Sequence, residues 1–285
     1  MQVKHKLLIS IQGIFLFLIF SNSSAWTIEE NYDAHQTGKQ CGTMWTGSGS
    51  PPNNRIVSDA KSSSGNNSCQ FWIEKGSKGP YGGGFYHPKA LVKGDEIWLR
   101  LRVYMPQGYD YTAPSEGENL KFLRFRTISG VDRTNHGFDD WYLLSKRHGS
   151  GKPFGYIYEG HLAWTYFGSD NDVIQLGNWE TYEFNIKFDN VPESKGGKAR
   201  VRIWKNGKLL AEVTNSKTLK TVDTIVTDTL LFSYWNGGSP ATQKLYVDDI
   251  VLTTDMPSMR DKNGNPYIGM GDFQSQAPPS PPAIN

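Results

Sequence analysis

Residues Thr229–Leu252 read TLLFSYWNGGSPATQKLYVDDIVL, and this stretch decides the fold class of the chain. Leu230, Phe232 and Tyr234 fall on one face of a strand, because side chains alternate between the two faces with a period of two. A Gly-rich loop follows, and Leu245–Leu252 is a second run of apolar and β-branched residues. The stretch therefore predicts two β-strands joined by a loop.

Alternating runs recur along the rest of the chain. The clearest are Glu96–Met105, Leu120–Thr127, Trp179–Phe188 and Ala199–Trp204. Lys205–Lys208 (KNGK) contains the Asn-Gly pair that is typical of a tight hairpin. Strands separated by turns, without helical intervals, predict an all-β fold that is an antiparallel β-sandwich of the jelly-roll type.

The first 25 residues have the features of a secretory signal peptide. Two lysines precede the apolar run Leu7–Phe20, and Ser23–Ala25 supplies small residues at the cleavage site. The run is short for a membrane span, and an uncleaved N-terminal anchor is the alternative. We expect a secreted protein, extracellular or periplasmic, with one jelly-roll domain over 26–255 and an extended tail over 256–285 that is Pro-rich at its end.

Export changes the charge balance of the chain. The whole chain has 30 basic and 28 acidic side chains, and the signal segment holds two lysines and no acids, which leaves 28 of each. A net charge of zero does not support attraction to nucleic acid or to an anionic membrane. We therefore expect no nucleic-acid partner and, after cleavage, no membrane partner. We also expect a monomer. Any preference for a polyanion must come from a local groove.

Two pairs of residues have predicted structural roles. Cys41 and Cys69 are the only cysteines, and in an oxidising compartment we expect them to form one disulfide, with two free thiols as the alternative. Asp248 and Asp249 lie in the second strand of the opening stretch, one on each face. They are candidates for a structural Ca²⁺ site, since hard oxygen ligands suit that ion, or for hydrogen bonds from backbone or Arg donors. No cofactor is required.

The first candidate for chemistry is a basic strand. Strict alternation in Leu120–Thr127 places Arg124 and Arg126 on one face and Lys121 on the opposite one. Each guanidinium can grip a carboxylate or a sulfate in a two-pronged contact. The alternative is a solvated strand face with cross-strand ion pairs.

The second candidate is Tyr156–Trp164, YIYEGHLAW. Tyr156 and Tyr158 share one face, and Glu159 and His161 share the other if the strand continues. Tyr and His can supply the acid and the base of a proton-abstraction reaction, although a Tyr base needs a lowered pKa or a cationic neighbour. The alternative is a core pair of tyrosines beside a surface histidine.

The third candidate is an aromatic series made of Trp141, Tyr142, Tyr234 and Trp235. Open rings on a concave sheet would form a platform for sugars, because sugars pack their C–H faces on aromatic rings. The alternative is that these large rings belong to the core.

Several runs together carry a family resemblance. KGDEIWLRLRVYMP, LKFLRFRT, NWETYEFNIKF, ARVRIWKNGKLL and LFSYWNGG…LYVDDIVL resemble secreted proteins of the concanavalin A-like jelly-roll superfamily, and most closely its bacterial polysaccharide-lyase-like proteins. The similarity covers roughly Ile56–Thr254. The glycoside hydrolases of this fold carry a Glu-x-Asp-x-x-Glu strand, which does not occur here, so a two-carboxylate hydrolase is disfavoured.

The resemblance implies β-elimination on a uronic-acid-containing polysaccharide. Arg124 or Arg126 would neutralise the sugar carboxylate and so stabilise the enolate-like charge. Tyr158 or Tyr142 would be the acid/base tyrosine, with His161 as an alternative base. The expected partner is an acidic polysaccharide, and the residues assigned to bind it are Lys121, Tyr156, Trp141, Tyr234 and Trp235. The alternatives are a noncatalytic, lectin-like carbohydrate-binding module and a structural or adhesive surface protein.

Overall fold

The computed structural model describes residues 25–42, 45–46, 55–79, 82–111, 119–144, 149–160, 163–191, 195 and 197–271. The predicted signal peptide lies outside these residues except for Ala25. No helix in the described ranges is long and apolar enough to cross a membrane.

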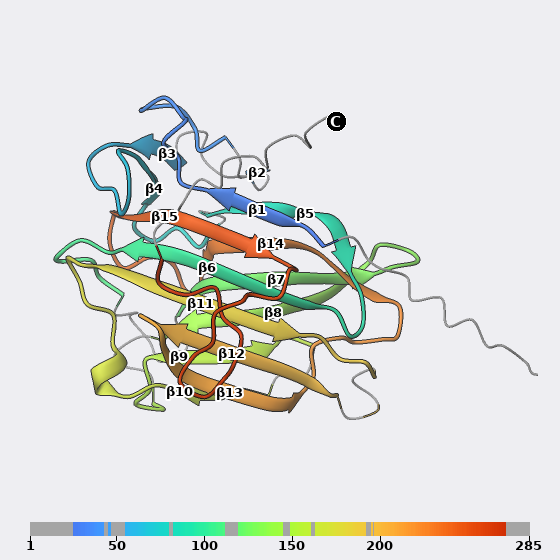
Figure 1. Ribbon diagram of the computed structural model, residues 1–285. Coiled ribbons are helices and arrows are strands. Elements are labelled where there is room, and N and C mark those ends of the chain that lie inside the picture. The colour runs from blue at the N-terminus through green and yellow to red at the C-terminus, as the bar shows by residue number, and fades with distance from the viewer. Residues whose placement is uncertain are drawn as a thin grey trace, which may run out of the picture.

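Two antiparallel sheets lie face to face (Figure 1). Sheet A is built from β1 (Thr27–Glu30), β3 (Arg55–Ser58), β4 (Ser68–Ile73), β6 (Glu96–Tyr104), β11 (Trp179–Lys187), β12 (Ala199–Lys205), β13 (Lys208–Ser216) and β15 (Gln243–Thr253). Its order is β13-β12-β11-β6-β15-β4-β3, and β1 pairs with β15.

Sheet B is built from β2 (Trp45–Thr46), β5 (Gly83–Leu91), β7 (Leu120–Ser129), β8 (Asn135–Leu143), β9 (Phe154–Tyr158), β10 (Thr165–Phe167) and β14 (Thr224–Trp235). Its order is β10-β9-β8-β7-β14-β5-β2. The predicted all-β, antiparallel sandwich of the jelly-roll type is confirmed, and the two strands of the opening stretch, β14 and β15, lie in different sheets.

The core lies between the two sheets and follows the alternation of the sequence. Leu99 of β6 and Phe184 of β11 are register partners, and both are fully buried. Across the sandwich, Phe122 of β7 packs edge-on against Tyr182 of sheet A, with ring centroids 4.9 Å apart. Edge-to-face aromatic pairs of this kind add to the stabilisation that burial itself provides. The sequence pattern therefore specifies one apolar face for each sheet.

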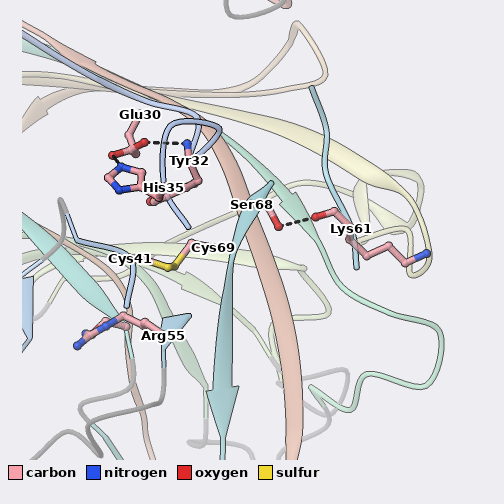
Figure 2. Close-up of a disulfide and its surroundings, with 9 residues drawn as sticks. Glu30, Tyr32, His35, Cys41, Arg55, Lys61, Ser68 and Cys69 are labelled. Carbon is pink, nitrogen blue, oxygen red and sulfur yellow. Dashed lines mark hydrogen bonds and ion pairs between the residues drawn. A yellow bond between two sulfur atoms is a disulfide. The ribbon is translucent and has the colours of Figure 1, made fainter. Parts of the chain in front are cut away.

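The disulfide between Cys41 and Cys69 is confirmed. It ties the segment after β1 to β4, and the two Cα atoms lie 5.9 Å apart. Figure 2 shows the same segment held by Glu30, whose carboxylate accepts a hydrogen bond from the Tyr32 amide at 2.7 Å and contacts His35 Nε2 at 3.1 Å. The N-terminal segment is thus fixed against the edge of sheet A by covalent and polar contacts.

The two adjacent acids of β15 take the hydrogen-bonded alternative. A bulge follows Asp248, and Asp249 has a positive φ of 48°. Both carboxyl groups are therefore buried, and they face the same loop, which contains Ser63. Asp248 Oδ2 accepts the Ser63 amide at 2.8 Å, and Asp249 Oδ2 lies 3.3 Å from Arg102 Nη1. Within the described ranges no three acids, histidines or cysteines gather as a metal site. A Ca²⁺ held with backbone carbonyls stays a prediction.

The segment after the domain is not an extended tail over its first part. Residues 256–271 pack across the outer face of sheet A, as the dark red trace in Figure 1 shows. Trp98 Nε1 donates to the Pro266 carbonyl at 3.3 Å, and Trp204 Nε1 donates to Asp261 Oδ2 at 2.9 Å. Two outward-facing tryptophans on sheet A need cover and a partner for each indole N–H, and this segment supplies both.

Candidate functional site

The outer face of sheet B carries a cluster of charged side chains at the centre of the sheet. Arg124 of β7 and Asp140 of β8 are register partners, so their side chains share a face. Lys121 and Glu159 join them, and we call these four residues the charged cluster. Asp140 is fully buried, whereas 30% of the Glu159 side chain is exposed. The charged cluster thus extends from a buried carboxylate at the sheet to a carboxylate that is partly exposed to solvent.

A β-bulge explains why Lys121 belongs to this cluster. The prediction placed Lys121 on the face opposite Arg124, but the register of β7 on β8 shifts between Lys121 and Leu123. Phe122 turns into the core instead. A bulge inserts one residue out of phase and so re-aims the side chains beside it. Lys121 Nζ consequently lies 3.1 Å from Asp140 Oδ2 and 2.6 Å from Glu159 Oε1.

The guanidinium of Arg124 is held from several sides. Its Nε and Nη2 donate to the two oxygens of Asp140 at 2.7 and 3.2 Å, which is a two-pronged contact. Nη2 also donates to Glu159 Oε1 at 2.8 Å. The guanidinium carbon lies 3.7 Å from the centre of the Phe138 ring. Two cations therefore face two carboxylates, and the cluster has no net charge.

The environment shifts the pKa values of this cluster. Burial by itself would lower the pKa of Arg124, but the charges of Asp140 and Glu159 raise it above its ordinary value. Burial, followed by the charge of Asp140, raises the pKa of Glu159, while Arg124 opposes the rise. Arg124 stays charged, and Glu159 is the carboxylate of the cluster that takes up a proton more readily than an exposed one would.

Tyr142 lies on the same face but is buried. Its hydroxyl donates to Asp140 Oδ2 at 3.2 Å, and Lys121 Nζ sits 5.5 Å from the centre of its ring. Burial and the charge of Asp140 raise the pKa of Tyr142. The phenol therefore keeps its proton at neutral pH and cannot act as the base that the sequence allowed. Only 4% of the residue is exposed, so its evident task is to orient Asp140 and Lys121.

Arg126 extends the charged face by one row. It alternates with the buried Phe125, so it shares the face of Arg124, and its Nε lies 2.7 Å from Asp228 Oδ1 of β14. Asp228 is fully buried, while about a third of the Arg126 side chain is exposed. The cross-strand ion pairs that were the alternative for this strand are present at both arginines. Arg126 is nevertheless the more exposed of the two arginines, whose side chains are 35% and 11% exposed.

Two exposed aromatic rings beside the cluster were missed from the sequence. Trp164, which directly precedes β10, and Tyr166 of β10 stack with centroids 5.6 Å apart and an interplanar angle of 9°. Trp164 also lies 4.8 Å from the Tyr142 ring. Gly155 of β9 makes room for it, because a Cβ there would lie 3.2 Å from the indole. The sequence signal that could have revealed this pair is the presence of two aromatic residues, two positions apart, opposite a glycine in the neighbouring strand.

The predicted tryptophan platform is not supported. Trp141 and Trp235 are 1% and 0% exposed and belong to the core between the sheets. Trp141 packs against Phe125 and Phe184, and the ring of Trp235 stacks on Tyr109. Their indoles face the interior because the apolar residues that they contact also face the space between the two sheets. The Tyr234 side chain, also assigned to the platform, lies outside the described residues.

The tyrosines of β9 share a face, but it is the core face. Tyr156 donates to Asp139 Oδ1 at 2.7 Å, and burial raises the pKa of both groups. Tyr158 donates to the His136 carbonyl at 3.3 Å and is buried. Both hydroxyls are therefore separated from Arg124 by the sheet, which removes Tyr158 from the acid/base role and Tyr156 from the binding role on that face. His161 lies outside the described residues.

Comparisons with known proteins agree on the fold. No protein-family model matches the chain, and no curated protein matches its sequence. Among solved structures, the alginate lyase Aly36B superposes with a TM-score of 0.56 at 15% identity, over 79% of this chain and 96% of that one. The chain has the fold of polysaccharide lyases.

Two further solved structures share this fold. The endo-β-1,4-glucuronan lyase of the fungus Trichoderma reesei has a TM-score of 0.53 at 12% identity, covering 77% of this chain and 94% of that one. The marine PL-14 alginate lyase of Aplysia kurodai has a TM-score of 0.51 at 10% identity, covering 70% and 87%. The resemblance read from the sequence, to polysaccharide-lyase-like proteins of the concanavalin A-like superfamily, is confirmed for the fold.

Proposed function

We propose that this protein is a secreted polysaccharide lyase that binds a uronic-acid-containing polysaccharide on the outer face of sheet B and cleaves it by β-elimination. One observation carries the proposal: Lys121 and Arg124 point two donors at a single, partly exposed point on that face, where both now hold one carboxylate oxygen. The fold shared with alginate and glucuronan lyases supports the same reaction class.

The two cations supply the first requirement of the reaction. The C–H bond next to a uronate carboxylate is weakly acidic, and it becomes more acidic when the carboxylate is neutralised, because the enolate-like charge is then stabilised. Lys121 and Arg124 take this role in the proposal. Arg126, whose side chain is about one third exposed, binds the carboxylate of a neighbouring sugar unit.

Proton transfer is assigned to His161. It takes the proton from the carbon that bears the carboxylate, and the released electron pair forms a C=C bond as the bond to the glycosidic oxygen breaks. The imidazolium then returns the proton to the leaving oxygen. Tyr142, with its raised pKa and its hydrogen bond to Asp140, is a positioning residue. Its hydroxyl holds Asp140, and Asp140 holds both cations.

Sugar rings stack on the exposed pair at the edge of the cluster. Trp164 and Tyr166 are 36% and 39% exposed, and their stacked, near-parallel rings present an apolar surface beside Tyr142, over whose ring Lys121 sits. A sugar unit that places its carboxylate at Lys121 would lie with its neighbour over this surface. Aromatic stacking orients the chain, and the cations select an acidic one.

A noncatalytic carbohydrate-binding module is the second candidate. It is favoured by the burial of Tyr142 and Tyr158, which leaves neither predicted tyrosine hydroxyl open to a ligand. Such a module would use the same cations and the same aromatic pair for recognition alone. It differs from the lyase only in the absence of proton transfer.

One experiment separates the two candidates. The mature protein is incubated with polyglucuronate, alginate and polygalacturonate while the absorbance of the unsaturated product is followed, and binding to each polymer is measured in parallel. Product from one of them supports the lyase, and Arg126→Gln should then weaken the reaction. Binding without product would favour the module, and neither binding nor product would contradict both.

A further inference from the structure

Glu159 reaches Lys121 and Arg124 from outside the strand that carries them. It lies in the turn directly after β9, where its backbone amide donates to the Phe138 carbonyl at 2.9 Å. Its side chain returns over β8 to reach the cations of β7. With 30% of that side chain exposed, it covers Lys121 and Arg124, whose side chains are only 10% and 11% exposed.

Both cations donate to the same oxygen. Glu159 Oε1 lies 2.6 Å from Lys121 Nζ and 2.8 Å from Arg124 Nη2. The carboxylate of a uronate is the same chemical group and requires the same two donors. A sugar carboxylate can therefore reach this position only when Glu159 leaves it.

Asp140 cannot be the carboxylate that a uronate displaces. It is fully buried and grips Arg124 with both oxygens, so it compensates the guanidinium permanently. With Glu159 withdrawn, Asp140 faces Lys121 and Arg124 alone, and the cluster carries one net positive charge. A single carboxylate from the glycan restores neutrality, which matches the charge of one uronate unit.

We propose that Glu159 is an internal competitor for the uronate carboxylate, holding the two donors of Lys121 and Arg124 until an acidic glycan displaces it. This inference rests on the proposed function and adds a selectivity device to the same face. Neutral glycans cannot replace Glu159 without leaving two cations undercompensated, so the face stays closed to them. Burial and the charge of Asp140, which raise the pKa of Glu159, make its carboxylate easier to displace than one fully satisfied by its partners.

Competition of this kind lowers the apparent affinity for the uronate by an amount that can be measured. When the binding-competent form is a fraction of the molecules, the apparent Kd rises by the inverse of that fraction. If Glu159 covers the donors in about nine molecules of ten, its removal tightens uronate binding by about ten-fold.

The test uses D-glucuronate as the probe, with D-glucose as the neutral comparison, and measures Kd by ligand-observed NMR at low salt. Glu159→Gln keeps the size of the side chain and removes its charge, and Glu159→Ala is the second variant in case the amide engages the cations. The matched control is Glu212→Gln. Glu212 pairs with Arg202 on sheet A, its side chain is 35% exposed, and its substitution changes the net charge equally.

The expected result is a gain of about ten-fold in glucuronate affinity for both Glu159 variants and a change within about two-fold for Glu212→Gln, with no gain for glucose. No gain in a folded Glu159 variant, or an equal gain in the Glu212 control, would overturn the inference. The proposed function fails differently: wild-type protein would then form no unsaturated product, whatever the glucuronate affinities are.

Discussion

Asp140→Asn is the perturbation that tests the architecture of the site most severely. The asparagine keeps the size of the side chain but removes the charge that compensates Arg124 at 2.7 Å and Lys121 at 3.1 Å in a fully buried position. Breaking a buried ion pair from one side costs about 3–5 kcal/mol, because the remaining charge is left without its partner. Glu159 still contacts both cations, so the lower end applies, and we expect a loss of about 3 kcal/mol.

The assay is urea unfolding followed by the fluorescence of the nine tryptophans. Glu212→Gln serves as the matched control, because its pair with Arg202 is partly exposed and should lose no more than about 1 kcal/mol. A loss below about 1 kcal/mol for Asp140→Asn, at an unchanged dependence on urea, would refute the reasoning. It would mean that Asp140 is not the group that holds the two cations in place.

Three further predictions concern other parts of the molecule. Burial raises the pKa of Glu183 to about 7. A folded-state pKa above the unfolded one destabilises the protein at high pH, so the contribution of Glu183 to the unfolding free energy should rise by about 2–3 kcal/mol from about pH 8 to pH 5. Urea titrations at several pH values should show this rise shrinking in Glu183→Gln; an equal rise in the variant would contradict the assignment. Gly155→Ala should shift the Trp164 ring by a few tenths of an ångström, since the new Cβ would lie 3.2 Å from the indole, and so weaken polysaccharide binding in affinity electrophoresis. Unchanged binding would remove Trp164 from the site. The double variant Cys41→Ser, Cys69→Ser opens a loop with a sequence separation of 28 and should lower the urea-unfolding free energy by roughly 3–4 kcal/mol, whereas a stability equal to that of wild type would show that the loop is held by its other contacts.

The strand pattern was predictable because it depends on local alternation alone. Alternation shows which residues share a face but not which face is buried, and this is the reason the aromatic series was misplaced. Trp141 and Tyr142 are neighbours on opposite faces of β8, and the structure buries the first between the sheets and the second under Trp164. Only the pairing of two sheets determines which face lies inside.

The charged cluster was predicted in part. Arg124 follows from alternation, but Lys121 joins it through a bulge that a period-two pattern cannot contain. Asp140 and Glu159 come from β8 and the turn after β9, and their meeting with Arg124 depends on strand register. The sequence therefore indicates the cations of the site and places Glu159 on the face opposite the β9 tyrosines, but it gives no sign that Asp140 and Glu159 neutralise these cations.

The segment 256–271 was predicted as part of an extended tail that is Pro-rich at its end. Many of its contacts are made by backbone groups, such as the Ile268 and Gly269 amides that donate to the buried Glu183 carboxylate. Backbone donors carry no sequence signal of their own. The outward-facing indole of Trp98 was the hint that sheet A needed a cover.

The most direct test of the central claim is the initial rate of unsaturated-product formation by wild-type protein on a uronate polysaccharide and on the carboxyl-reduced form of the same polymer. The two substrates share linkage and length and differ only in the group that Lys121 and Arg124 are proposed to hold. We predict product from the uronate polymer and none from its reduced form. Absence of product from every uronate polymer, or equal rates on the two forms, would contradict the account.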